Sequence, residues 1–262
     1  MSVLSLLKKV FNRDLNFVDV GAYLGDFSEE IVRSFPGSRG LLYEPTPETY
    51  AKLNARFCSN SSIQTVQAAV SNRTGTAEFY LAEDAATNSL LRFHSEPQNH
   101  PKASVSVVTL DEELGRNTDL WKVDLLKIDT QGNDLKVLLG AQRTLEKDQP
   151  VVLLETIFLP LYRQQDNYFE IWQFFAERAY HVAGIYNAHY TEDGILAFSD
   201  FLFVPARLIH VLHRNDLSRG RFVCTDSETL LAENKNLLAV CAERLELIQR
   251  LDGELRKLMK RR

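Results

Sequence analysis

Short apolar runs alternate with amphipathic segments along the first part of the chain. Three apolar runs, at residues 16–20, 40–43 and 63–70, are each typical of a buried strand. Between them, apolar side chains recur at helical spacing; one such segment ends at Pro36 and the next begins at Pro47. Strands that alternate with helices in this way predict a parallel sheet covered by helices on both faces.

The pattern changes after residue 74. Residues 76–81 alternate like a half-buried strand, a polar stretch follows up to Lys102, and residues 104–110 form another candidate strand, so we expect an excursion from the main sheet. The main pattern then resumes with a helix after residue 133, a helix over 169–178, and four apolar runs at 123–128, 151–154, 180–185 and 198–204. About seven core strands result, which predicts a doubly wound, mostly parallel α/β sheet.

Residues 227–262 contain no proline and a single glycine, and they favour one long helix after a domain of residues 1–226. The apolar residues near heptad positions of this helix are Leu230, Leu237, Cys241, Ile248, Leu251, Leu255 and Leu258. Asn234 and Arg244 interrupt the stripe. The helix therefore either lies on its own domain or forms a coiled coil with a second copy, and the sequence leaves both interpretations open.

The composition disfavours several classes of protein. A net charge of -5 gives no general attraction to nucleic acid or anionic membranes, and no stretch approaches the roughly 18 apolar residues of a membrane span. The apolar run near the N-terminus is too short for a signal peptide. Cys58, Cys224 and Cys241 stand far apart and suggest neither a disulfide framework nor a zinc site. We therefore expect a cytoplasmic protein that binds no nucleic acid.

A glycine-containing turn follows the first strand. Gly21 and Gly25 permit a sharp turn and a close approach to a ligand, and the helix that follows offers unpaired N–H groups, which is typical of a nucleotide cofactor site. A dinucleotide fold needs G-x-G-x-x-G to admit a pyrophosphate, whereas Tyr23 stands where the second glycine would be. S-adenosyl-L-methionine carries no phosphate, and its ammonium group suits a strand-end carboxylate such as Asp19.

Glu44 ends the second strand, where a carboxylate can accept hydrogen bonds from both ribose hydroxyls of an adenosine ligand. A nicotinamide dinucleotide would use the same position, so Glu44 indicates an adenosine-containing cofactor but does not distinguish S-adenosyl-L-methionine from a dinucleotide. The glycine spacing makes that choice, because it disfavours an NAD-dependent oxidoreductase.

Four successive segments, at residues 18–26, 44–48, 69–72 and 126–134, together with Gly140-Ala141, resemble the ordered motifs of the FkbM-type methyltransferases. The resemblance implies a class I methyltransferase (Rossmann-like) fold that transfers methyl groups from S-adenosyl-L-methionine to hydroxyls, often on sugars or macrolide natural products. The cofactor-binding residues that it implies, with the turn and strand-end residues above, are Asp19, Gly21, Tyr23, Gly25, Glu44, Pro45 and Ala69.

The chain departs from the family pattern at two places. Tyr23 stands where members commonly have Asn, and Gln131-Gly132-Asn133 stands where many have Glu-Gly-Phe. These departures affect the expected substrate more than the cofactor. The resemblance runs from about residue 16 to residue 155, so the C-terminal helix inherits nothing from it.

A hydroxyl is a poor nucleophile near neutral pH, so methyl transfer gains from a positioned base, by on the order of 100- to 10,000-fold. Asp129 and Glu155 each follow an apolar strand, and they are the candidate catalytic residues. Either could instead serve a structural role, Asp129 as the N-cap of the next helix, or the two could hold Mg²⁺ against a vicinal diol. His94 and His100 are weaker candidates for the base.

The polar stretch over residues 82–102 is the longest segment without regular elements near this edge of the sheet, and we expect it to be a mobile lid. Within it, Asn88 and Ser89 are candidate contacts to the methionine end of the cofactor, with a surface loop as the alternative. His210 and His213 have a spacing that could bind a metal, but nothing completes a site, so no metal is expected.

These observations together predict an S-adenosyl-L-methionine-dependent O-methyltransferase that acts on a hydroxyl of a glycan or glycosylated metabolite. The alternative is a degenerate methyltransferase fold that serves as a binding or scaffold protein and recruits a partner through its C-terminal helix. Asp19, Gly21, Gly25 and Glu44 argue against degeneracy, because a core kept for stability alone has no need of a ribose carboxylate.

Overall fold

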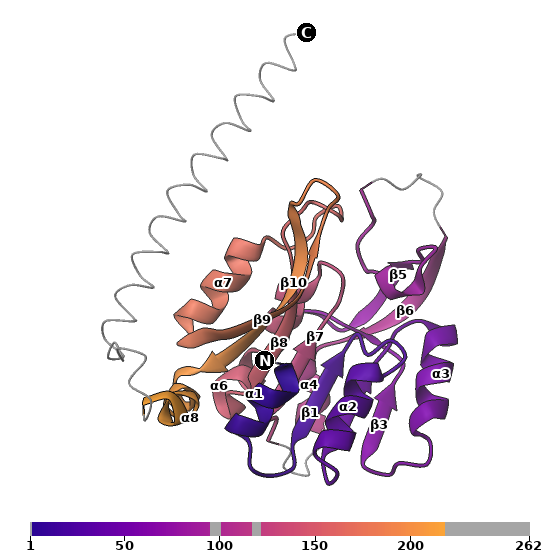
Figure 1. The fold of residues 1–262 in the computed structure, drawn as a ribbon. Helices are drawn as coiled ribbons and strands as arrows, with labels where there is room; N and C mark the ends of the chain where they lie inside the picture. Colours follow the sequence, from indigo (N-terminus) through magenta and orange to yellow (C-terminus); the bar gives the residue numbers. More distant parts are fainter. Residues whose placement is uncertain (1, 95–100, 117–121, 218–262) are drawn as a thin grey trace, which may run out of the picture.

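A seven-stranded sheet runs through the computed structural model, which describes residues 2–94, 101–116 and 122–217 (Figure 1). The strand order is β3-β2-β1-β7-β8-β10-β9. The strands are β1 (Asn16–Val20), β2 (Arg39–Tyr43), β3 (Ile63–Val66), β7 (Leu125–Ile128), β8 (Val151–Ile157), β9 (Tyr180–Tyr190) and β10 (Leu196–Pro205). The first five strands in this order are parallel, and β10 is antiparallel to both of its neighbours. The expected mostly parallel seven-stranded sheet is confirmed.

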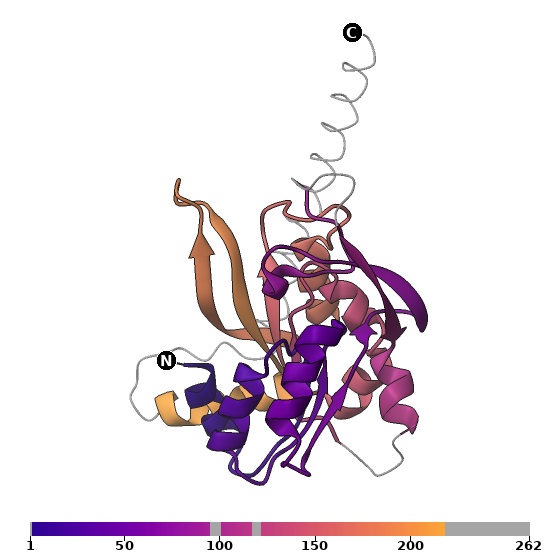
Figure 2. The ribbon, with the colours of Figure 1, turned by 90° about the vertical axis from the view of Figure 1, so that its right-hand side faces the viewer.

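Helices cover both faces of this sheet (Figure 2). One face packs against α1 (Val3–Val10), α2 (Asp26–Ser34), α3 (Pro47–Phe57) and α8 (Ala206–Leu217). The other packs against α4 (Leu110–Arg116), α5 (Asp134–Leu139), α6 (Gln142–Asp148) and α7 (Tyr168–Glu177). Because side chains alternate along a strand, Phe17 of β1 enters the first core and Val18 the second. The doubly wound architecture follows from strands that are apolar on both faces.

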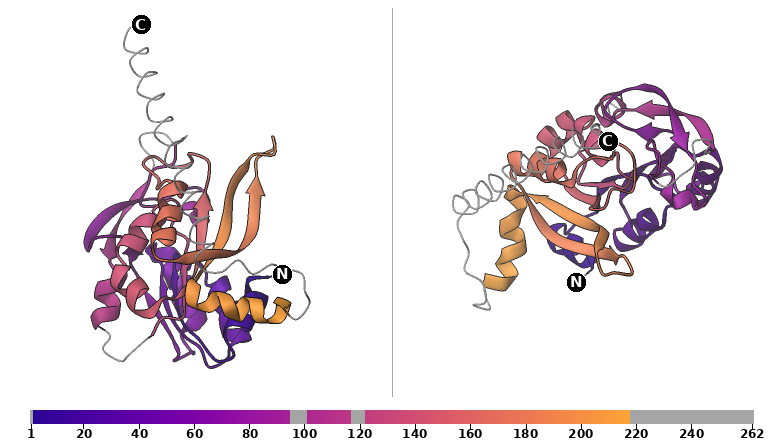
Figure 3. Two further views of the ribbon diagram at one scale, coloured as in Figure 1. Left: turned by 90° about the vertical axis from the view of Figure 1, so that its left-hand side faces the viewer. Right: turned by 90° about the horizontal axis from the view of Figure 1, so that it is seen from above.

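A second, three-stranded sheet forms the excursion between β3 and β7. Its order is β4-β6-β5, with β4 (Ala69–Val70), β5 (Gly75–Tyr80) and β6 (Lys102–Val108). The prediction of one strand over residues 63–70 is wrong, because the chain leaves the main sheet after Val66 and joins the small sheet at Ala69. The small sheet and the β9–β10 hairpin lie on opposite sides of the molecule (Figure 3).

Four helices were not expected from the sequence: α6, which follows α5 after Gly140-Ala141, and three others. The helix α1 begins after Ser2, whose hydroxyl accepts a hydrogen bond from the Ser5 N–H at 3.2 Å. The expected strand over 104–110 ends at Val108, and α4 begins after Thr109, whose hydroxyl accepts from the Glu112 N–H at 3.3 Å. The third, α8, follows β10 directly. The segment 227–262, predicted to be a long helix, lies outside the described residues, as does the boundary of the domain at residue 226.

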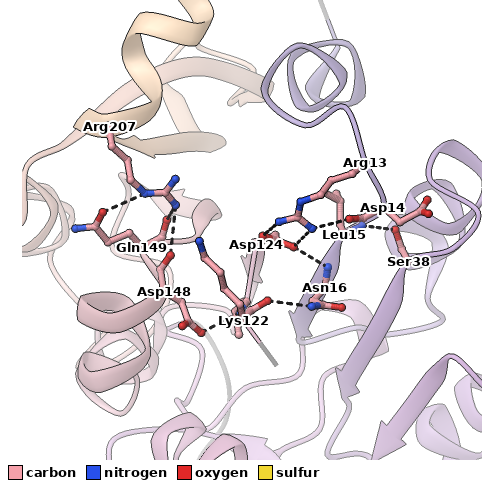
Figure 4. A network of polar contacts seen from close by, with 11 residues as sticks. Arg13, Asp14, Leu15, Asn16, Ser38, Lys122, Asp124, Asp148, Gln149 and Arg207 are labelled. Carbon is pink, nitrogen blue, oxygen red and sulfur yellow. Dashed lines mark hydrogen bonds and ion pairs between the residues drawn. The ribbon is translucent and has the colours of Figure 1, made fainter. Parts of the chain in front are cut away.

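A polar network joins the elements at the amino ends of β1 and β7 (Figure 4). Arg13 donates to both oxygens of buried Asp124 at 2.6 and 2.9 Å, and the same carboxylate accepts from the Asn16 N–H at 3.0 Å. The guanidinium of Arg207 on α8 donates to the Gln149 carbonyl at the end of α6, at 2.7 Å. This network fixes how β1 and β7 start, and their paired register then brings their carboxyl ends together at the opposite edge.

No helix within the described ranges is both long and apolar enough to cross a membrane.

Candidate active site

The strand order reverses direction between β1 and β7, which is where ligands bind in open α/β sheets, beyond the carboxyl ends of the strands. Gly21 follows β1 and Asp129 follows β7. Gly21 has a φ of 77°, and a Cβ atom there would lie 1.8 Å from the Asp129 carbonyl oxygen. Glycine is therefore required because two strand-end loops touch each other, in addition to any approach of a ligand.

A cleft opens beside this contact, with about 690 Å³ of space including its solvent-open part. This size suits a small organic ligand. The expected cofactor-binding residues that line it are Gly21, Tyr23, Glu44, Pro45, Ala69 and Asn88, and Asp129 lines it as well. The structure therefore brings residues from four separate motifs to one cavity.

Asp19, Gly25 and Ser89 are not among the lining residues. Gly25 begins α2 with a φ of 84°, and a Cβ there would meet the side chains of Leu53 and Phe57, so this glycine serves packing. Ser89 is buried, and its hydroxyl donates to the Gln131 carbonyl at 2.8 Å. Gly25 thus contributes to the packing of α2 against α3, and Ser89 supports the loop that carries Gln131.

Asp19 is fully buried below the turn. Its Oδ2 accepts from the Ser28 hydroxyl at 2.6 Å, and its Oδ1 has no hydrogen-bond partner but lies 3.4 Å from Nζ of Lys127. The structure therefore places Lys127 where we expected the ammonium group of the cofactor. A buried carboxylate needs such a partner, because an isolated charge away from water is costly.

Lys127 is a site residue that the sequence analysis missed. Its Nζ lies 3.4 Å from Asp129 Oδ2 as well as from Asp19. Burial alone would lower the pKa of this lysine, but the carboxylates of Asp19, Asp129 and Asp200 together raise it above its usual value. The available signal was a lysine inside a buried strand, two positions before Asp129 and so on the same face.

Glu44 is 6% exposed and faces the cleft. Its Oε1 accepts from the Thr46 N–H at 2.9 Å, and it forms no ion pair in the part of the chain that the structure describes. Burial raises the pKa of Glu44, and the Thr46 hydrogen bonds oppose that rise. A nearly buried carboxylate without a cation, at the edge of a cavity, suits the two hydroxyl donors of a ribose, so the residues present fit an adenosine cofactor.

Asp129 and Glu155 are brought together by Gln131, whose Nε2 donates to Asp129 Oδ1 at 3.0 Å and to Glu155 Oε2 at 2.8 Å. The N-cap interpretation of Asp129 is wrong, because α5 begins at Asp134 and the Asp129 carboxylate binds Gln131 and Lys127. Glu155 lies inside β8, since that strand continues to Ile157.

Burial raises the pKa of Glu155 well above its usual value, and repulsion from Asp129, Asp134 and Asp200 adds to the effect. Asp200 pairs with Glu155 across β10 and β8, and burial raises its pKa too. The site thus contains a carboxyl group that readily holds a proton.

The loop between Asp129 and α5 is built around Asp134. Its Oδ1 accepts from the Thr130 N–H at 2.9 Å and hydroxyl at 2.7 Å, and its Oδ2 accepts from the Gly132 N–H at 3.2 Å. Burial raises the pKa of Asp134 to about 7. This carboxyl group holds the loop in the shape that presents Gln131 to the two acidic residues.

The alternative site chemistry fits the geometry less well. An amide donor lies between Asp129 and Glu155, where Mg²⁺ would have to bind, and no described residues form a group of three metal-ligating side chains. His94 is exposed and does not line the cleft, and its backbone N–H donates to the Leu161 carbonyl at 2.7 Å. His100 and the side chain of His213 lie outside what the structure describes.

The first part of the expected lid, residues 82–94, covers the cleft. It contains a short 3₁₀ helix at Ala85–Thr87, and Ala85, Ala86 and Asn88 line the cavity. Bridges from Ser89 to Tyr80 and from Phe93 to Tyr162 attach it on both sides. The segment is therefore more regular than its composition indicated. The mobility of residues 82–102 remains a prediction. Residues 95–100 of this segment are not among the residues that the structure describes.

Comparison with known proteins agrees with this geometry. A family model described as the Methyltransferase FkbM domain matches residues 19–182. "Methyltransferase 1" of Beauveria bassiana (strain ARSEF 2860) is 29% identical over 148 residues, covering 50% of this chain and 59% of that protein. "Methyltransferase sdnD" of Sordaria araneosa is 28% identical over 152 residues, covering 47% and 59%. The chain thus spans less than two thirds of the curated relatives that it matches.

Among solved structures, methyltransferase FkbM from Methylobacillus flagellatus KT aligns with a TM-score of 0.48 at 15% identity, over 72% of this chain and 43% of that one. The family match extends from Asp19 in the first strand to Val182 in β9, and so includes the whole cleft. The chain belongs to the FkbM family of S-adenosyl-L-methionine-dependent methyltransferases.

Proposed function

We propose that this protein transfers a methyl group from S-adenosyl-L-methionine to a hydroxyl oxygen of a glycan or glycosylated metabolite. The observation that carries the proposal is the carboxylate pair of Asp129 and Glu155, which adjoins the cofactor-sized cleft at the Asp129 end. A hydroxyl acceptor needs a nearby base, and a carboxyl group with a raised pKa suits that task.

The cofactor, when bound, supplies an electrophilic methyl group on a sulfonium centre. Glu44 would hold its ribose hydroxyls, while Tyr23, Pro45, Ala69 and Asn88 would form the walls around it. Gly21 would let the β1 loop lie close to the cofactor. Asp19 would hold the ammonium group of Lys127, and this ion pair would determine the local charge beneath the turn after β1. Gly25 and Ser89 would keep the surrounding loops in place.

The acceptor hydroxyl would lose its proton to the carboxylate pair as the new C–O bond forms and the bond between the methyl group and sulfur breaks, with S-adenosylhomocysteine as the leaving group. Glu155 suits the role of final proton carrier, because burial raises its pKa and so favours its protonated form more than in an ordinary glutamate. Asp129 lines the cleft and would orient the hydroxyl. A base of this kind contributes on the order of 100- to 10,000-fold to the rate.

Two measurements test this function. Calorimetric titration with S-adenosylhomocysteine is expected to show binding; its absence would leave a degenerate fold that acts as a scaffold. Incubation with methyl-labelled S-adenosyl-L-methionine and a panel of glycosides, each matched with its fully O-blocked form, is expected to label only compounds with free hydroxyls. Label on nitrogen or carbon, or equal label on the blocked forms, would contradict O-methylation.

A further inference from the structure

Gln131 occupies the centre of the acidic cluster without a role in the reaction as derived so far. Its carboxamide makes three hydrogen bonds: Nε2 donates to Asp129 and to Glu155, and Oε1 accepts from the Tyr162 hydroxyl at 2.7 Å. Ionised carboxylates can only accept hydrogen bonds, and a phenol next to them can donate one, so this orientation of the amide satisfies every partner.

The backbone at Gln131 is held as firmly as the side chain. Its φ of 55° lies in the left-handed region, which costs a residue with a side chain about 1 kcal/mol. Its carbonyl accepts from the Ser89 hydroxyl at 2.8 Å, and Gly132 follows with a φ of 90°. A strained backbone conformation persists where surrounding contacts impose it, and such residues are concentrated at functional sites.

We propose that Gln131 is the positioning residue of the catalytic pair: its amide holds Asp129 and Glu155 side by side at the end of the cleft, and Tyr162 fixes which end of the amide faces them. The inference rests on the proposed function, in which this pair receives the proton of the acceptor hydroxyl.

The same arrangement connects the pair to the cover of the cleft. The Tyr162 hydroxyl oxygen also lies 3.1 Å from the Thr87 carbonyl oxygen, and the Ser89 hydroxyl donates to the Gln131 carbonyl. Thr87 and Ser89 flank Asn88, which lines the cavity. Gln131 is thus bonded to the cover directly through its backbone and linked to it through Tyr162, so a cofactor that orders the cover would also order the carboxylate pair.

The proposal has a measurable electrostatic consequence. Glu155 faces Lys127 on β7, Asp129 directly after that strand, Asp134 at the start of α5 and Asp200 on β10. Within this set the Gln131 amide is a neutral donor that favours the ionised form of Glu155. Loss of one such hydrogen bond at a buried carboxylate raises its pKa by about one pH unit, since one unit corresponds to about 1.4 kcal/mol.

The test is a carboxyl ¹³C NMR titration of the full chain, with the Glu155 signal assigned by its disappearance in Glu155→Gln. In Gln131→Met, which keeps the size and removes the donor, the titration midpoint of Glu155 is expected to rise by about one pH unit. In Gln131→Glu, which keeps the shape and adds a third carboxyl group, it is expected to rise further.

Gln149→Met is the matched control. Gln149 also has a left-handed backbone, with a φ of 47°, and one side-chain bond, accepted from Arg207 Nε at 3.1 Å, in the network at the opposite edge of the sheet. It is expected to leave the Glu155 titration unchanged. A Glu155 midpoint that is equal in the wild type, Gln131→Met and Gln131→Glu would overturn the proposal. Binding of S-adenosylhomocysteine, measured separately on the same samples, tests the proposed function independently of this result.

Discussion

Replacement of Glu44 is the sharpest test of the cofactor site. The wild-type carboxylate is 6% exposed, lines the cleft and uses one oxygen for the Thr46 N–H. A hydrogen bond to a charged group contributes about 1.5–3 kcal/mol, so Glu44→Ala is expected to weaken S-adenosylhomocysteine binding about 10- to 150-fold. Glu44→Gln keeps an acceptor for the Thr46 N–H but loses the charge, so the affinity of this variant for S-adenosylhomocysteine is expected to lie between those of the wild type and Glu44→Ala.

The assay is calorimetric titration, with the melting temperature measured for each variant. Glu48→Ala is the control, because Glu48 lies four residues further on, its side chain is 82% exposed, and its Oε1 binds Lys52 at 2.9 Å away from the cleft. Because burial raises the pKa of Glu44, acidification is expected to weaken binding from a higher pH than an ordinary glutamate would give. A folded Glu44→Ala protein with wild-type affinity would refute the assignment of Glu44 to the ribose.

Three further predictions concern stability and assembly. The pKa of Asp134 is about 7 in the folded protein against 3.8 for the free group, so the folded state binds one more proton than the unfolded state between these pH values. The free energy of unfolding is therefore expected to fall by up to roughly 4 kcal/mol from pH 4 to pH 8. Asp134→Asn is expected to remove this pH dependence in urea titrations. Gly21→Ala is expected to destabilise the protein by about 3 kcal/mol or more, whereas Gly194→Ala, at a φ of 78° with open space around it, is expected to cost about 1 kcal/mol; equal melting temperatures would contradict this. Removal of the segment 227–262 is expected to convert a self-associated protein into a monomer in light scattering, and identical monomeric masses for both forms would mean that the segment does not join copies.

The sheet was predictable because each strand carries its own apolar run. The first strand, for example, has the predicted bounds, Asn16–Val20, and is buried on both faces. The break at residues 67–68 was not predictable in this way, since Val66 and Ala69 are both apolar and only the pairing partners show that they belong to different sheets. The start of α4 carried a usable signal, the Thr109-x-x-Glu112 spacing of a capping box, which the strand pattern before it obscured.

The candidate site was also predictable only in part. Glu44 and Asp129 could be identified because a strand-end carboxylate is visible in sequence and strand ends converge at one edge. Gln131 could not be identified, because its role depends on atoms from β8 and from the loop before α7, which only the folded chain brings together. Lys127 carried one signal, its place inside a buried strand, but its partner Asp19 lies on β1 and is visible only in the fold. The contact between buried Asp19 and Lys127 joins two different strands, so it could not be predicted from the spacing of residues in the sequence.

A crystal structure of the protein with S-adenosylhomocysteine tests the central claim most directly, because that claim is the position of the cofactor. The account predicts the ligand in the cleft between the turn after β1 and the cover at Ala85–Asn88, with its ribose hydroxyls within hydrogen-bond distance of the Glu44 carboxylate. A ligand bound elsewhere, or one that occupies this cleft with Glu44 turned away from the ribose, would contradict it.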